Sequence, residues 1–129
     1  MHSLWHQIAT RYADRPPSLV FELVNEPRAP MTPEQWNELL ATTLCVVRAV
    51  DPDREVLVGP VMANAVAALS SLELPNDPHL TATVHYYSPF AFTHQGAWWE
   101  PGSAAWIGTT WSTAADRAAV TADLVSARS

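Results

Sequence analysis

Residues 19–27 read Leu-Val-Phe-Glu-Leu-Val-Asn-Glu-Pro, and this stretch decides the fold expected for the whole chain. Its first six residues are mostly apolar and rich in residues that favour strands, as in a strand of a parallel sheet that is covered on both faces. Asn25, Glu26 and Pro27 end this strand. Ligands of α/β folds bind where strands end, so this tripeptide is also the first place to look for chemistry.

Further elements lie around this strand in strict alternation. Apolar residues at helical spacing predict a helix from about residue 3 to residue 13 and another from Thr32 to Val50. Thr32 can cap the second helix, Pro33 suits its first turn, and Gln35 completes a capping box. The other predicted elements are strands at 55–58 and 80–86, a helical stretch at 64–72, a long aromatic loop at 88–111 and a last helix at 113–127. This alternation predicts βα units that form a parallel sheet with right-handed crossovers.

The composition is that of a folded protein and narrows the range of partners. The chain has 129 residues, of which 48% are hydrophobic and 16% charged, and its net charge is −6. Seven scattered basic residues make neither a face for nucleic acid nor a polybasic patch for a membrane surface. The single cysteine, Cys45, excludes an internal disulfide and a zinc site built from several thiolates. No metal or organic cofactor is expected, and the cellular compartment stays open, with secretion of a parent protein as one option.

Two strand ends carry side chains suited to catalysis, Asn25-Glu26-Pro27 and His85-Tyr86-Tyr87. Cleavage of a glycosidic bond needs a carboxylic acid that donates a proton to the leaving oxygen, together with a second carboxylate. From the residues alone, Glu26 is either such a donor or a solvated residue in a capped turn. His85 and Tyr87 either position a substrate or a carboxylate, or they pack in the core.

Tryptophans gather in the predicted loop after the last strand. Four of the six in the chain fall between residues 98 and 111. An indole ring can stack on the apolar face of a sugar, and it can equally fill a core. Trp98 and Trp99 are therefore candidates for a sugar platform, with packing as the alternative.

The two strand ends together resemble glycoside hydrolase family five, the cellulase family. Residues 21–27 resemble its fourth barrel strand, in which Asn precedes the acid/base Glu, and residues 84–90 resemble its sixth strand with a His-x-Tyr motif. Residues 47–60 resemble the intervening helix and strand, and residues 92–98 resemble a substrate-side loop. The resemblance covers nearly all of the chain. It implies an α/β fold, a partial TIM (β/α)8 barrel comprising about strands 4–6 with their flanking helices.

The resemblance also implies a role for each site residue. Glu26 would be the general acid/base, and Asn25 would hydrogen-bond the 2-hydroxyl of the sugar at the point of cleavage. His85 would line the same subsite, and Tyr87 would contact the carboxylate of the nucleophile. Trp98 or Trp99 would stack on a sugar ring.

One catalytic residue has no match in this sequence. A complete barrel takes about 250 residues, so residues 1–129 are expected to be the central fragment of a single catalytic domain, with the nucleophile Glu beyond the C-terminus. The expected function is part of a retaining hydrolase of β-1,4-glucan, of the endoglucanase type, that is inactive as the fragment alone. The alternatives are a mannanase, xylanase or exo-glucosidase of the same family, or a non-catalytic carbohydrate-binding remnant. The expected partner is a β-glucan polysaccharide or oligosaccharide, with no nucleic acid and no membrane.

Overall fold

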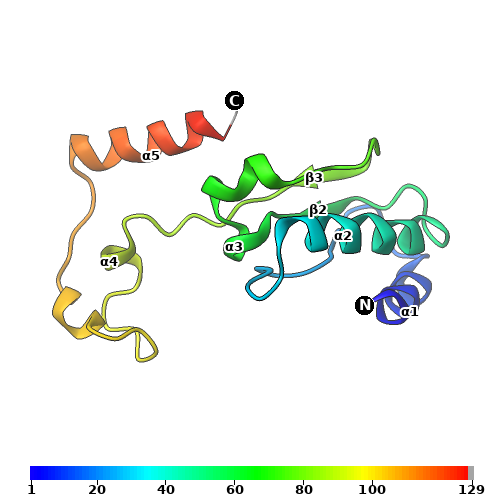
Figure 1. Cartoon of the computed structure of the whole chain (residues 1–129), viewed down its shortest axis with the longest axis horizontal. Coiled ribbons are helices and arrows are strands. Elements are labelled where there is room, and N and C mark those ends of the chain that lie inside the picture. Colours follow the sequence, from blue (N-terminus) through cyan, green and yellow to red (C-terminus); the bar gives the residue numbers. More distant parts are fainter. Residues whose placement is uncertain (128–129) are drawn as a thin grey trace. The chain divides into compact units, whose positions relative to one another are not determined.

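The computed structural model describes residues 1–127, and the chain forms two compact units, residues 1–85 and residues from 86 onward. Figure 1 shows the elements along the chain. The first unit contains α1 (His2–Tyr12), β1 (Phe21–Glu22), α2 (Pro33–Arg48), β2 (Val56–Val58), α3 (Val61–Asn64), the 3₁₀-helix η1 (Val66–Ser71) and β3 (Leu80–Ala82). The second contains α4 (Phe90–Thr93), the 3₁₀-helix η2 (Ser103–Trp106) and α5 (Ala114–Ser126).

The three strands form a parallel sheet in the order β1-β2-β3, which confirms the predicted topology. Phe21 lies opposite Val56, and Val56 lies opposite Leu80. The strands are shorter than predicted, because regular pairing is limited to two residues of β1 and three each of β2 and β3. An isolated parallel bridge between Ala65 and His85 continues the pairing beyond the end of β3.

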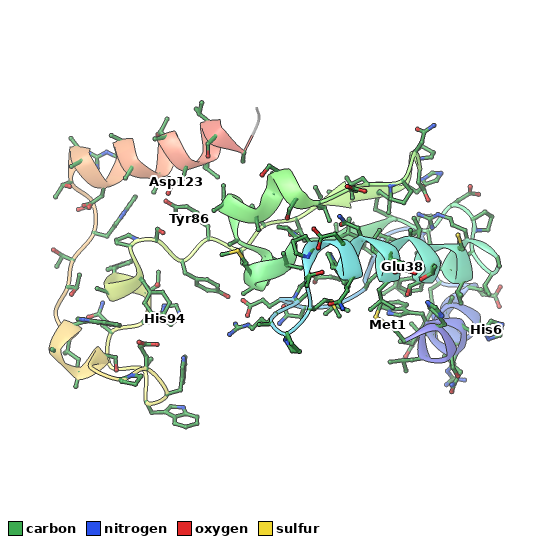
Figure 2. The ribbon with its side chains drawn as sticks, in the orientation of Figure 1. Met1, His6, Glu38, Tyr86, His94 and Asp123 are labelled. Carbon is green, nitrogen blue, oxygen red and sulfur yellow. The ribbon has the colours of Figure 1, made fainter. Side chains whose placement is uncertain are left out.

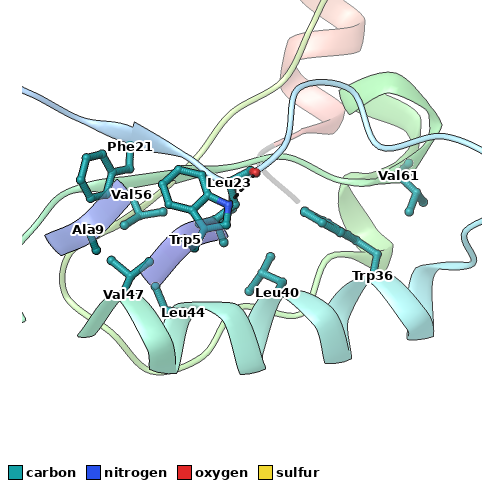
Figure 3. Close-up of a cluster of buried hydrophobic side chains, with 12 residues drawn as sticks. Trp5, Ala9, Phe21, Leu23, Trp36, Leu40, Leu44, Val47, Val56 and Val61 are labelled. Carbon is teal, nitrogen blue, oxygen red and sulfur yellow. Dashed lines mark hydrogen bonds between the residues drawn. The ribbon is translucent and has the colours of Figure 1, made fainter. Parts of the chain in front are cut away.

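The hydrophobic core lies between the sheet and the two long helices of the first unit. Alternate strand residues point into it, and Figure 3 shows their side chains facing those of α1 and α2. The largest apolar side chains that are fully buried are those of Trp36, Leu40, Val47, Val56 and Val58. Burial of one such aliphatic or aromatic side chain contributes about 1.5–3 kcal/mol.

Within the first unit, the opposite face of the sheet is open. Glu22 and Thr81 are exposed there, and Leu57 between them is half-buried. Only one face of the strands is covered within the first unit, so the expectation of cover on both faces stays a prediction. The alternation of buried Phe21 with exposed Glu22 is the pattern of a sheet with one apolar and one polar face.

Both helix starts marked in the sequence are confirmed. Thr32 accepts a hydrogen bond from the backbone N–H of Gln35, and the Gln35 side chain accepts one from the N–H of Thr32, so both arms of the capping box are present. Thr113 and Asp116 make the same arrangement at the start of α5. Such reciprocal caps satisfy backbone donors that a helix leaves unpaired.

A buried arginine that follows α2 contacts the segment between α1 and β1. The side chain of Arg54 is 4% exposed and pairs with Asp51 at 2.8 Å. Its guanidinium also lies over the ring of Phe21, 5.4 Å from the centroid. The same group donates to the backbone carbonyls of Tyr12, Ala13, Arg15, Pro16 and Leu19. Arg54 thus fixes the connection between α1 and β1.

In the second unit, α5 is tied to the start of the loop by one hydrogen bond. Tyr86 donates its hydroxyl to Asp123 at 2.7 Å, and Figure 2 shows the two side chains pointing toward each other. This hydrogen bond to a carboxylate raises the pKa of Tyr86 above its usual value. None of the helices in the described range is long and apolar enough to cross a membrane.

Candidate active site

Glu26 lies just beyond β1, where the backbone leaves the extended conformation. Its φ is +51°, a left-handed conformation that costs a non-glycine residue about 1–2 kcal/mol. The side chain is only 13% exposed. A strained backbone of this kind persists where the surroundings hold it, and it is common at active sites.

Two basic side chains contact the Glu26 carboxylate. The Nδ1 of His85 lies 2.8 Å from Oε1, in a hydrogen bond that the ring N–H donates to the carboxylate. The guanidinium of Arg28 pairs with the other oxygen, Oε2. The chain segments that follow β1 and β3 therefore meet at the contact between Glu26 and His85. Asn25 precedes Glu26 with an exposed side chain.

Arg28 was not among the residues singled out in the sequence. It stands two positions after Glu26, and its side chain is 68% exposed. The signal available was its position next to an acid at a strand end, since a cation there stabilises the charged carboxylate. An exposed arginine in a loop has so many other roles that this signal is weak.

The end of β2 holds the two other strand ends together. The helical stretch predicted at 64–72 is present as the 3₁₀-helix η1 at Val66–Ser71. Before it, the backbone makes a left-handed turn in α3, with φ of +59° at Met62, +60° at Ala63 and +58° at Asn64. The left-handed turn was not predicted, because small apolar residues suit a right-handed helix.

The side chain of Asn64 is fully buried in this turn. Within the described residues, neither its amide nitrogen nor its amide oxygen has a hydrogen-bond partner. A buried polar group without a partner costs about 1–3 kcal/mol. Asn64 was not a predicted site residue, because nothing in the sequence shows that the turn is left-handed.

The other predicted site residues belong to the second unit and form an aromatic cluster around His94. The His94 ring stacks on Phe90 with centroids 3.8 Å apart, and Tyr87 and Trp99 approach its ring at 5.2 and 6.4 Å. Trp98 contacts Trp99 edge-on, with centroids 5.7 Å apart. Figure 2 marks His94 in this region. Trp98 is 90% exposed and Trp99 60%, so both present most of an indole ring to solvent.

The chemistry available in the first unit is proton transfer by a carboxylate. Glu26 is shielded from bulk water and oriented by His85, as a general acid or base requires. In residues 1–127 no group of three or more His, Cys, Asp or Glu side chains is placed to hold a metal ion.

Comparison with known proteins identifies the family. The model of the cellulases, glycosyl hydrolase family 5, matches residues 1–124. The chain belongs to this family. It is 37% identical over 97 residues to endoglucanase H of Acetivibrio thermocellus, and 36% identical over 98 residues to cellodextrinase A of Ruminococcus flavefaciens. These matches cover 74% and 76% of the chain.

Solved structures of family 5 enzymes identify the fold to which the chain belongs. The endoglucanase Cel5A of Thermotoga maritima is 41% identical to the chain, with a TM-score of 0.91 over 95% of it. The family 5 neighbours are TIM-barrel endoglucanases, so the parallel strands with flanking helices are part of a (β/α)8 barrel. The chain spans 40% of the Thermotoga enzyme, 29% of the cellodextrinase and 11% of endoglucanase H.

Proposed function

We propose that this family 5 chain supplies the acid/base half of a site that hydrolyses β-1,4-glucan with retention of configuration. The observation that carries the proposal is the Glu26 carboxylate, held by His85 and Arg28 at the carboxyl end of a parallel sheet. The second carboxylate, the nucleophile, belongs to residues outside this chain. The complete barrel is then either a longer polypeptide that includes this chain or a chimera in which residues 1–127 replace the matching segment of the Thermotoga endoglucanase.

The proposed reaction has two displacements. In the first, Glu26 gives its proton to the leaving oxygen while the nucleophile, about 5–5.5 Å away across the bond, attacks the anomeric carbon. In the second, Glu26 takes a proton from the water that releases the sugar. The His85 ring keeps the carboxylate aimed at the same place during both steps.

The Arg28 guanidinium beside Glu26 favours the second step over the first. A neighbouring guanidinium stabilises the charged carboxylate, which suits the second step, in which Glu26 acts as a base. The first step needs the protonated acid. We therefore expect bound substrate to displace the exposed Arg28 side chain from Glu26.

The remaining predicted residues would contact the substrate. Asn25, exposed beside Glu26, would bind the 2-hydroxyl at the cleavage subsite. Tyr87 would contact the nucleophile carboxylate. Trp98 and Trp99 would stack on sugar rings, which their exposure supports.

The substrate class follows from the relatives. The similar proteins are mostly endoglucanases, and one is a cellodextrinase. The Thermotoga enzyme is described in complex with cellobiose and also with mannotriose. β-1,4-Glucan is therefore the first candidate and β-mannan the second, while xylanase, exo-glucosidase and non-catalytic binding remain outcomes of the test.

The deciding experiment replaces Glu26 by Gln in the complete barrel. General acid/base catalysis typically contributes about 10²–10⁴-fold, so we expect a loss of that size on cellulose. Formation of the glycosyl intermediate from an activated aryl cellobioside, whose leaving group needs little protonation, should be spared. The control is Glu38→Gln, which changes an exposed carboxyl on the outer helix α2. Wild-type activity of Glu26→Gln on cellulose would contradict the assignment.

A second experiment concerns the 129-residue chain by itself. A retaining site needs two carboxylates across one bond, and residues that act as one unit lose most of the rate together. We expect the purified chain to release no reducing sugar from cellulose under conditions in which the complete barrel does. Turnover by the chain alone would show that its own residues supply the nucleophile.

A further inference from the structure

The left-handed turn in α3 connects the two strand ends that carry the candidate catalytic pair. The backbone N–H of Ala63 donates to the carbonyl of Pro27, the residue after Glu26, at 3.1 Å. The backbone N–H of His85 donates to the carbonyl of Asn64 at 2.8 Å. The turn is thus hydrogen-bonded to the backbone on both sides of the Glu26–His85 contact.

The absence of a side chain at Gly59 leaves space for the Asn64 side chain of this turn. An added Cβ at Gly59 would lie 2.4–2.6 Å from Cγ, Oδ1 and Nδ2 of Asn64, closer than any side chain allows. Gly59 is not among the residues with positive φ, so a side chain is excluded there by lack of space and not by the backbone conformation. The carbonyl of Gly59 also accepts a hydrogen bond from Nε1 of the buried Trp36 at 2.9 Å, which ties Gly59 to α2. The packing of the Asn64 side chain against Gly59 is called the lock below.

The lock is not explained by local stability. Three consecutive residues are in the left-handed region, and the buried Asn64 amide has no partner within the described residues. Such features persist where the surroundings over-determine them, and they gather where a structure must hold a particular geometry. Here the geometry that is held is the approach of His85 to Glu26.

We propose that Gly59 and Asn64 act as one positioning unit, in which the Asn64 side chain seated on Gly59 fixes the left-handed turn, and the turn fixes the Glu26–His85 contact. This role rests on the proposed function, because it positions the residues of that reaction. Neither residue touches the substrate or the reacting atoms. Their effect is on the orientation of the Glu26 carboxylate.

The first test needs no activity and uses the complete barrel. The ring ¹⁵N chemical shifts of His85 report its hydrogen bond to Glu26, and the Glu26→Gln variant gives their values when the carboxylate is removed. We expect Gly59→Ala to move these shifts toward the Glu26→Gln values. The control is Gly108→Ala, where φ is +95° and an added Cβ meets nothing within 4 Å. It strains a backbone without a clash and should leave the His85 shifts unchanged.

A second variant tests the other half of the lock and does not depend on tolerance of the Gly59 clash. Asn64→Gly removes the side chain while glycine keeps the left-handed conformation available. We expect it to move the His85 shifts in the same direction. Because the two residues form one unit, the double variant should be no worse than the more damaging single variant. His85 shifts at wild-type values in both single variants, or single effects that simply add, would overturn the proposal.

The complete barrel supplies the catalytic readout. A misplacement of about 1 Å can cost about 10²-fold in rate, so we expect kcat of Gly59→Ala to fall by roughly 10–100-fold with little change in KM. A purely structural role would lower the melting temperature and leave kcat per folded molecule unchanged, which would also overturn the proposal. Failure of the proposed function is separate, because it would appear as wild-type activity of Glu26→Gln.

Discussion

Replacing Arg54 by Met should remove a large part of the stability of the first unit. Methionine keeps an unbranched apolar stem over Phe21 but donates no hydrogen bond. The guanidinium makes hydrogen bonds to five backbone carbonyls and pairs with Asp51, and the side chain is 4% exposed. Its loss leaves the other three carbonyls and the Asp51 carboxylate without this donor, whereas the carbonyls of Tyr12 and Pro16 still accept from backbone N–H groups.

The size of the effect follows from this burial. Removing one partner of a buried ion pair costs about 3–5 kcal/mol, and a hydrogen bond to a charged group contributes about 1.5–3 kcal/mol. The carbonyls can regain water if the segment at 12–19 rearranges, so we expect a loss of about 3–5 kcal/mol and not the sum of all bonds. For a domain of this size, each 1 kcal/mol lowers the melting temperature by roughly 4–8 °C. The variant should therefore melt at least about 12 °C lower.

The measurement is thermal unfolding followed by far-UV circular dichroism, together with amide hydrogen exchange in β1 and β2, which reports the first unit by itself. Arg11→Met is the matched control, because Arg11 is an exposed arginine in the last turn of α1. Arg54→Lys should fall between the two, since one ammonium cannot replace the planar fork of donors. Equal melting temperatures for Arg54→Met and Arg11→Met would refute this account of the connection between α1 and β1.

Other predictions concern the aromatic loop, the partly buried ion pair between Arg48 and Asp77, and the edges of the sheet. Trp98→Ala or Trp99→Ala should weaken oligosaccharide binding by the complete barrel by about 1–3 kcal/mol in calorimetric titration; unchanged affinity with a lower melting temperature would favour a packing role. Arg48 holds the pKa of Asp77 below its usual value, so this carboxylate stabilises the fold above the unfolded pKa of about 3.9, and the stability is lost as pH falls through the lower folded pKa. The difference in urea stability between wild type and Asp77→Asn should therefore be largest near neutral pH and shrink in acid; a difference independent of pH would contradict the pairing. Finally, β1 and β3 are the outer strands of the sheet, and open edges promote pairing between chains. The isolated chain should therefore self-associate in sedimentation experiments, and a monomer at every loading concentration would contradict this.

The parts of the fold that were predictable depend on short-range patterns. Thr32 with Gln35 defines the start of α2, and apolar spacing of about 3.6 residues defines its buried face. Alternation of helices and strands was enough to give a parallel sheet, and a parallel sheet brings its strand ends to one edge. The meeting of Glu26 and His85 was therefore accessible from sequence, although 59 positions separate them.

The parts that were missed depend on contacts between distant residues. Nothing local shows that Arg54 reaches back to carbonyls 35–42 positions earlier. Nothing local shows that Met62 and Ala63 turn left-handed, because both residues favour a right-handed helix. Gly59 reads as a simple strand end, and only the buried Asn64 amide against it shows why no side chain fits. The placement of Tyr87, Trp98 and Trp99 relative to Glu26 stays a prediction.

The departures from regular backbone structure in the first unit lie at the carboxyl end of the sheet. All of its non-glycine residues with left-handed φ, Glu26 and those at 62–64, follow the ends of β1 and β2. The core is regular, with the capped helix α2 packed on buried strand residues. The backbone is regular in the core, which stabilises the unit, and irregular where two strand ends meet. This distribution is expected when a fold supports a site at the carboxyl end of its strands. Trp36 joins the two regions, since its ring belongs to the core and its N–H holds Gly59. The precision of the Glu26–His85 contact therefore depends on the core beneath it, and a core substitution at Trp36 should disturb the site as well as the stability.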